Sequence, residues 1–165
     1  MKKKLLLVCV VGLLAANVFA DHPGGKLGVG VFGGGGSSTA AGGRGSLGLS
    51  LKLSGLPLFW GVTAYFGDPF LMNVSADYYL IDDDLVKDGS FNLDWFFGIG
   101  GFGRFYISSN DFAVDLGLRL PIGLSWHIIN NVELFADVVP GLGISLQGNP
   151  LDWTWGGELG LRLWL

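Results

Sequence analysis

The chain has 165 residues, a formal net charge of −4 and 29 glycines, and half of its residues are apolar. The length suits one domain. Cys9 is the only cysteine and lies in the N-terminal apolar run, which excludes disulfides and thiol catalysis in the processed chain. Once Lys2, Lys3 and Lys4 are removed, the chain has seven basic and fourteen acidic residues. This excess of acidic residues argues against a nucleic-acid partner.

The first twenty residues have the layout of a secretory signal peptide. Three lysines precede an apolar run from Leu5 to Ala16, and small residues end the segment at Ala20. The run is shorter than the roughly 20 residues of a membrane-spanning helix, which is the alternative. We expect cleavage before Asp21, so that residues 1–20 are a signal peptide and residues 21–165 form the processed domain.

Apolar residues alternate with small or polar ones through most of the remaining chain. This period of two predicts β-strands with one apolar face. In the first part of the chain we expect strands at 26–32, 45–53, 58–66, 71–80 and 91–103. The Gly- and Ser-rich segment 33–44 is predicted as a flexible loop, the acidic segment 81–90 as an exposed connection, and 104–111 as a second loop.

The clearest alternation runs from Phe112 to Ile128, where every even-numbered residue is apolar. Pro121 interrupts it, because proline cannot donate to a ladder. We favour one bent strand; the alternative is two strands broken at Pro121, giving nine elements and spoiling barrel closure. With a turn at 129–131, Ile128 faces Val132 and Leu120 faces Pro140. The last two strands are expected at 132–146 and 151–165.

Eight strands joined by short connections predict an all-β, eight-stranded antiparallel up-and-down barrel in which the first and last strands meet. An eight-stranded barrel has an interior that side chains fill. Because the apolar face carries Leu, Phe and Trp while the other carries mostly small and polar residues, we expect a transmembrane barrel with its apolar face toward lipid.

The segment Arg119–Gly143 (RLPIGLSWHIINNVELFADVVPGLG) and the final GGELGLRLWL resemble the small outer-membrane barrels of the OmpA, OmpX and OmpW kind. The resemblance implies insertion by the outer-membrane assembly machinery, which reads an alternating last strand ending in an aromatic residue. Here Leu165 takes the final place and Trp164 precedes it. The family offers no catalytic motif to carry over.

Charged residues on the small-residue face form the only candidate site. Buried charges must be paired, so we expect a hydrogen-bonded plug in the lumen; the alternative is a narrow ion path. The members of this predicted lumen polar cluster are Lys52, Asp77, Asp94, Arg104, Asp115, Arg119, His127, Glu133, Asp137, Glu158 and Arg162.

Ser125, His127 and Glu133 are not a catalytic set, because the first two lie two residues apart on one strand, roughly 7 Å along it. We expect His127 to pair with Glu133 across the strands instead. Two G-x-G-x-x-G matches lie in predicted strands and are not dinucleotide sites. The acidic residues of 81–90 lack the spacing of a calcium loop.

The sequence thus predicts that residues 21–165 form an outer-membrane β-barrel domain with both termini in the periplasm. The expected role is structural, with no enzymatic activity, metal or cofactor. The expected partners are outer-membrane lipid and the assembly machinery, and the expected state is a monomer. The alternative function is a narrow pore or an OmpW-like carrier of small apolar molecules, with lumen aromatics as its lining: Phe96, Phe102, Phe135 and Trp164.

Overall fold

The computed structural model describes residues 26–39, 42–88, 91–108, 112–147 and 151–165. The predicted signal peptide at 1–20 lies outside these residues. None of the described residues belongs to a helix that is long and apolar enough to cross a membrane.

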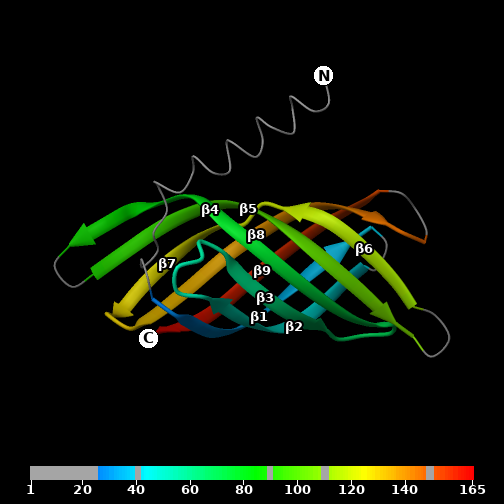
Figure 1. The fold of residues 1–165 in the computed structure, drawn as a ribbon, viewed down its shortest axis with the longest axis horizontal. Coiled ribbons are helices and arrows are strands. Elements are labelled where there is room, and N and C mark those ends of the chain that lie inside the picture. The colour runs from blue at the N-terminus through cyan, green and yellow to red at the C-terminus, as the bar shows by residue number, and fades with distance from the viewer. Residues whose placement is uncertain (1–25, 40–41, 89–90, 109–111, 148–150) are drawn as a thin grey trace, which may run out of the picture.

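The described residues form nine β-strands in one antiparallel sheet that closes on itself (Figure 1). The first and last strands pair continuously, from Gly28 opposite Trp164 to Ser38 opposite Thr154. This pairing confirms the predicted closure, which leaves no sheet edge along the seam. The strands are β1 (Gly28–Ser38), β2 (Gly42–Lys52), β3 (Phe59–Tyr65), β4 (Phe70–Asp88), β5 (Phe91–Ile107), β6 (Phe112–Arg119), β7 (Ile122–Ile129), β8 (Val132–Ser145) and β9 (Asp152–Trp164).

Strands β6 and β7 share one position in the barrel. Both pair with β5 on one side and with β8 on the other. The break falls at Pro121, which has no N–H to donate, so our preference for one continuous strand is wrong. The expectation that a break here would spoil barrel closure is also wrong. The Gly98 N–H donates to the Pro121 carbonyl at 2.8 Å, and the Leu120 N–H donates to the Pro140 carbonyl at 2.9 Å. The latter bond confirms the predicted facing of Leu120 and Pro140. The predicted facing of Ile128 and Val132 is wrong, because the register shifts after His127 and Ile129 pairs with Val132.

Three predicted loops are strand in the structure. Residues 33–38 and 42–44 belong to β1 and β2, 81–88 extend β4, and 104–107 extend β5. A glycine run has no side chains to alternate, so the period-two pattern fades there although the ladder continues. Residues 81–88 pair with β5 only, because β3 pairs with β4 no farther than Asp77. They are mostly exposed, so neither face of this hairpin needs to be apolar.

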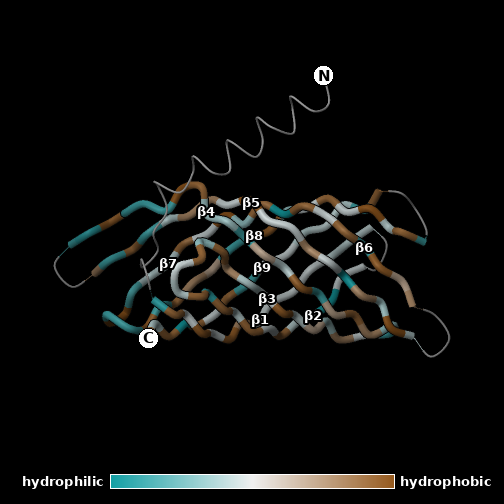
Figure 2. The backbone as a smooth tube through the Cα atoms, in the orientation of Figure 1, coloured by the Kyte–Doolittle hydropathy of each residue, from teal (hydrophilic) through white to brown (hydrophobic). Residues whose placement is uncertain are grey.

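The apolar face points outward. Leu116, Leu118 and Leu161 are 47%, 63% and 47% exposed, whereas their neighbours Asp115, Arg119 and Arg162 are buried. Figure 2 shows this alternation of hydrophobic and hydrophilic residues along the strands of the wall. The structure therefore confirms an antiparallel barrel with an apolar outer face. We call the end that holds Gly28 and Trp164 the terminal end, at the left of Figure 1, and the opposite end the distal end.

Glycines serve different purposes on the two faces. A Cβ added to the inward Gly48 would collide with the ring of Phe32, so the ring packs directly on the β2 backbone. A Cβ added to Gly45, on the outward face of the same strand, would meet nothing within 4 Å. Only the inward glycine is required by packing.

We therefore expect Gly48→Ala to lower the free energy of unfolding by about 1–3 kcal/mol, because it overpacks the lumen. Gly45→Ala is the matched control on the same strand and should change it by less than about 0.5 kcal/mol. Urea unfolding in detergent micelles, followed by tryptophan fluorescence, measures both. Equal effects of the two substitutions would contradict the packing of Phe32 on Gly48.

Candidate functional site

The predicted lumen polar cluster lies on the inward positions of seven strands. Eight of its eleven members are buried, and His127, Asp137 and Glu158 are half-buried. Their inward direction follows from strand parity, because most of them alternate with more exposed residues on their own strands. The cluster divides into groups at the terminal end, in the middle and at the distal end.

At the terminal end, Glu133 is the acceptor for three side chains. The guanidinium of Arg162 contacts its two carboxylate oxygens at 2.7 and 2.8 Å. The Trp164 indole N–H donates to it at 2.8 Å and the Ser125 hydroxyl at 3.0 Å. Arg162 also donates to the Ser50 hydroxyl at 3.1 Å. This dense bonding compensates the burial of both charges.

Aromatic rings form a layer across the lumen beside this group. The rings of Phe59 and Tyr79 stack at 4.1 Å between centroids, and those of Tyr79 and Phe96 at 4.4 Å. Trp164 meets Phe59 edge-on at 6.3 Å. The Arg162 guanidinium lies 4.7 Å from the Phe59 ring centroid, a cation–π contact. We call Phe59, Tyr79, Phe96 and Trp164 the aromatic layer.

In the middle of the lumen, Arg119 joins two carboxylates from different strands. Its Nε lies 3.1 Å from Asp77 on β4, and a terminal nitrogen lies 3.5 Å from Glu158 on β9. Asp137 sits directly opposite Glu158 in the β8–β9 register. Its buried Oδ1 has no hydrogen-bond partner among the described residues.

At the distal end, Arg104 pairs with Asp152 at 3.2 Å and donates to the Tyr106 hydroxyl at 3.3 Å. Thr39 donates its hydroxyl proton to the same Asp152. Asp115 is buried directly opposite Arg104 in the β5–β6 register. Sequence reasoning did not include Asp152 in the cluster, although it falls in the predicted last strand. Its even parity there, shared with Glu158, is the signal that would have included it.

His127 and Glu133 are opposite each other in the β7–β8 register, as expected. The His127 Nδ1 also lies 3.4 Å from Asp94 on β5. Arg162, Trp164 and Ser125 surround the Glu133 carboxylate, so His127 lies beside a carboxylate that three other side chains contact.

The described residues include no metal centre of the kind that clustered ligands would form. No group of three or more His, Cys, Asp or Glu side chains in that part of the chain could hold a metal ion. The Ser125 hydroxyl donates to Glu133 rather than to an imidazole. The four aromatic residues proposed as a carrier lining are all buried, with exposures of 0% to 7%.

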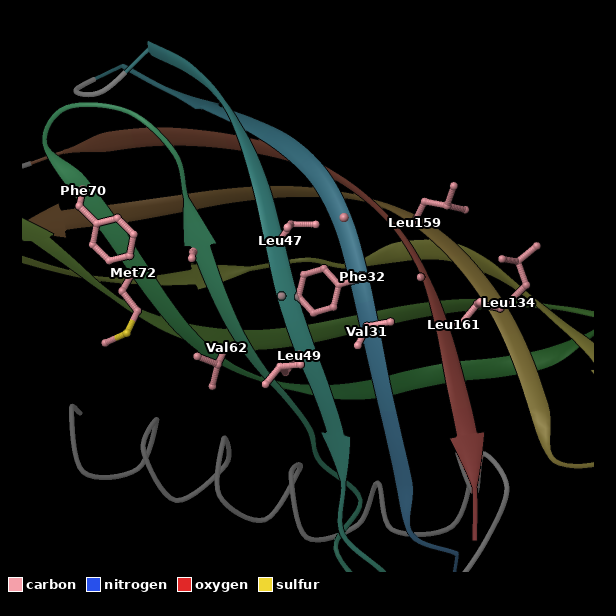
Figure 3. A pocket seen from close by; sticks show the side chains of 14 residues that line it. Val31, Phe32, Leu47, Leu49, Val62, Phe70, Met72, Leu134, Leu159 and Leu161 are labelled. Carbon is pink, nitrogen blue, oxygen red and sulfur yellow. The ribbon is translucent and has the colours of Figure 1, made fainter.

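A groove of about 720 Å³ lies on the outer wall (Figure 3). It crosses β8, β9, β1, β2, β3 and β4, and the side chains around it are apolar. Gly33 on β1 lies between Leu47 on β2 and Leu159 on β9 and has no side chain, which leaves a depression in the outer surface at this point. The groove belongs to the apolar outer face rather than to the lumen.

No family model and no curated protein sequence matches the chain. Among solved structures, the chain is similar to Neisserial surface protein A, with 16% identity, a TM-score of 0.54 and coverage of 84% of this chain and 95% of that one. It also matches the N-terminal β-barrel domain of Pseudomonas aeruginosa OprF (15% identity, TM-score 0.49, coverage 86% and 98%) and a designed transmembrane β-barrel (15%, 0.43, 88% and 100%). At this identity, the likeness to Neisserial surface protein A shows a shared barrel fold.

We expect Arg162→Met to lower the free energy of unfolding by about 3–5 kcal/mol, because it leaves Glu133 buried without its cation. Adding Glu133→Gln should recover part of this loss. The exposed Lys87–Asp84 pair is the control, and Lys87→Met should leave the unfolding midpoint unchanged. Denaturant unfolding of the wild-type protein, the two single variants and the double variant measures these changes in the free energy of unfolding. A double variant no more stable than Arg162→Met would argue against a tight pair.

Proposed function

We propose that the chain is an integral protein of the bacterial outer membrane, with a packed lumen and a structural role in the membrane. The observation that carries the proposal is the continuous apolar outer face of a closed barrel. Closure satisfies the backbone groups within the wall, which a span without water requires. The barrel fold shared with Neisserial surface protein A supports it.

Exposed aromatic residues at the two ends of the wall also support a membrane position. Trp60 lies toward the terminal end and is 37% exposed. Transmembrane barrels carry such aromatic girdles at both membrane–water interfaces. The distal girdle flanks the hairpin connections and comprises Phe66, Phe70, Phe112, Trp153 and Trp155, all exposed.

The packing of the lumen favours a structural role over transport or catalysis. Arg104, Arg119 and Arg162 each pair with a carboxylate from another strand. The interior aromatics pack against one another and against these cations, which leaves them occupied rather than lining a ligand site. We therefore propose a non-enzymatic protein and rank the carrier hypothesis below it.

The strand order supports a specific orientation. An even number of barrel positions puts both ends of the described chain, Lys26 and Leu165, at one end of the barrel. We propose that this terminal end faces the periplasm, after export through a cleaved signal peptide. Leu159, Leu161 and Leu163 on β9 are exposed to the outside, as the assembly machinery requires of a last strand in the families that the chain resembles. We propose a monomer.

We expect Leu118→Arg to prevent stable insertion, because an arginine near the middle of a lipid-facing wall costs about 2–4 kcal/mol. Leu85→Arg is the matched control: Leu85 is 54% exposed but lies in the β4–β5 hairpin beyond β3, so this variant should insert normally. Outer-membrane fractionation and the shift in gel mobility on boiling measure insertion and folding. A soluble barrel would tolerate both substitutions equally, and that result would refute the proposal.

A further inference from the structure

The groove on the outer wall is open at a point where the chain has room for a side chain. Gly33 faces outward there, between Leu47 on β2 and Leu159 on β9. A Cβ added to Gly33 would meet only the flexible end of Leu47 at 3.3 Å and the Ser46 carbonyl at 3.8 Å. Among the described residues, no contact requires a glycine at this position. An occupant of the groove would require it.

Outward glycines continue this flat surface from the groove toward the distal end. Gly35 on β1 pairs with Gly45 on β2 and with Gly157 on β9. A Cβ added to Gly45 would meet nothing within 4 Å, and one added to Gly35 or Gly157 would meet only backbone atoms, no closer than 3.2 Å. Three neighbouring strands therefore present backbone rather than side chains between the groove and the distal girdle.

A cation lies where this surface reaches the distal end. Arg44 on β2 is half-buried, and its guanidinium donates to the Asp68 carbonyl at 3.1 Å and to the carbonyl of Pro69. The next residue, Phe70, lines the groove and belongs to the distal girdle. An apolar groove with a cation at one end is complementary to an amphiphile with an anionic headgroup. A guanidinium group suits phosphate in particular.

The width of the groove favours a lipid with several acyl chains. The groove crosses six neighbouring strands, which lie about 4.8 Å apart and so span about 24 Å of the wall. Figure 3 shows Phe70 and Met72 at one end of the groove and Leu134 at the other. One or two acyl chains would leave part of this width uncovered. In the proposed orientation the distal half faces the outer leaflet, where lipid A carries several acyl chains and phosphate.

We propose that the groove and Arg44 form a binding site for one molecule of lipid A. Its acyl chains lie over Gly33 and Gly35 and fill the groove, and one of its phosphates contacts the Arg44 guanidinium. The inference rests on the proposed function, which makes the outer wall face lipid and the distal end face outward. It adds a defined lipid at a fixed place on that wall.

The test measures lipid binding to the processed full chain in detergent micelles by native mass spectrometry, with lipid A as the probe. The wild-type protein should bind one molecule per chain. Gly33→Leu fills the groove and should weaken binding at least about tenfold, because it displaces methylene groups of the lipid from apolar surface. Arg44→Gln removes the cation and should weaken binding about fivefold.

Two matched variants serve as controls and should bind lipid A as the wild-type protein does. Gly101→Leu fills an outward glycine on β5, outside the groove, where a Cβ would meet only the Gly117 carbonyl at 3.7 Å. Lys26→Gln removes an exposed cation at the terminal end. The gel-mobility shift on boiling shows which variants are folded. Ala64→Leu, also in the groove, replaces Gly33→Leu if that variant does not fold.

Three results would each overturn the inference: unchanged binding by a folded groove variant, equally tight binding of phosphatidylglycerol, or a dimer that Gly33→Leu dissociates. The last result would assign the groove to a second copy of the chain. Binding in micelles does not depend on membrane insertion in the cell. Absence of the wild-type protein from the outer-membrane fraction would therefore contradict the proposed function alone, and the two failures are distinguishable.

Discussion

The pairing of β1 with β9 is the contact on which the rest of the structure depends. Eleven consecutive residues of β1 pair with β9, from Gly28 to Ser38, and this seam turns an open sheet into a ring. Once the ring is closed, every strand must turn one set of side chains inward and the other outward. The apolar outer wall and the charged interior are therefore two consequences of one closure.

A ring of eight strand positions has a narrow interior, and this explains how rings and glycines are distributed within it. Inward aromatic rings lie over inward glycines of adjacent strands: Phe32 over Gly48, Phe135 over Gly160 and Phe102 over Gly117. The missing side chains provide the space that the rings occupy. Guanidinium groups then pack between rings and carboxylates, as Arg162 does between Phe135 and Glu133, so that apolar and charged groups share one dense core.

The hairpin of β4 and β5 departs from this pattern where it leaves the barrel. β3 pairs with β4 only as far as Asp77, yet β4 continues to Asp88. Bulges interrupt the β4–β5 register after Tyr79 and after Asp84. The side chains here are exposed, and the Lys87 ammonium hydrogen-bonded to Asp84 lowers the pKa of that carboxyl. Charges and bulges are features that keep an extended edge from pairing with other chains.

The alternation of residues was sufficient to predict the fold class, the closure and the outward face, because a period of two and strand parity are local properties of the chain. Which of the lumen residues meet each other was decided by the tertiary structure. Arg119 faces Gly100 and Gly141 in the register, but its guanidinium reaches Asp77 on β4 and Glu158 on β9, since the glycines beside it carry no side chain. The extents of β1, β2 and β4 were likewise fixed by hydrogen bonds to neighbouring strands, which no local pattern contains.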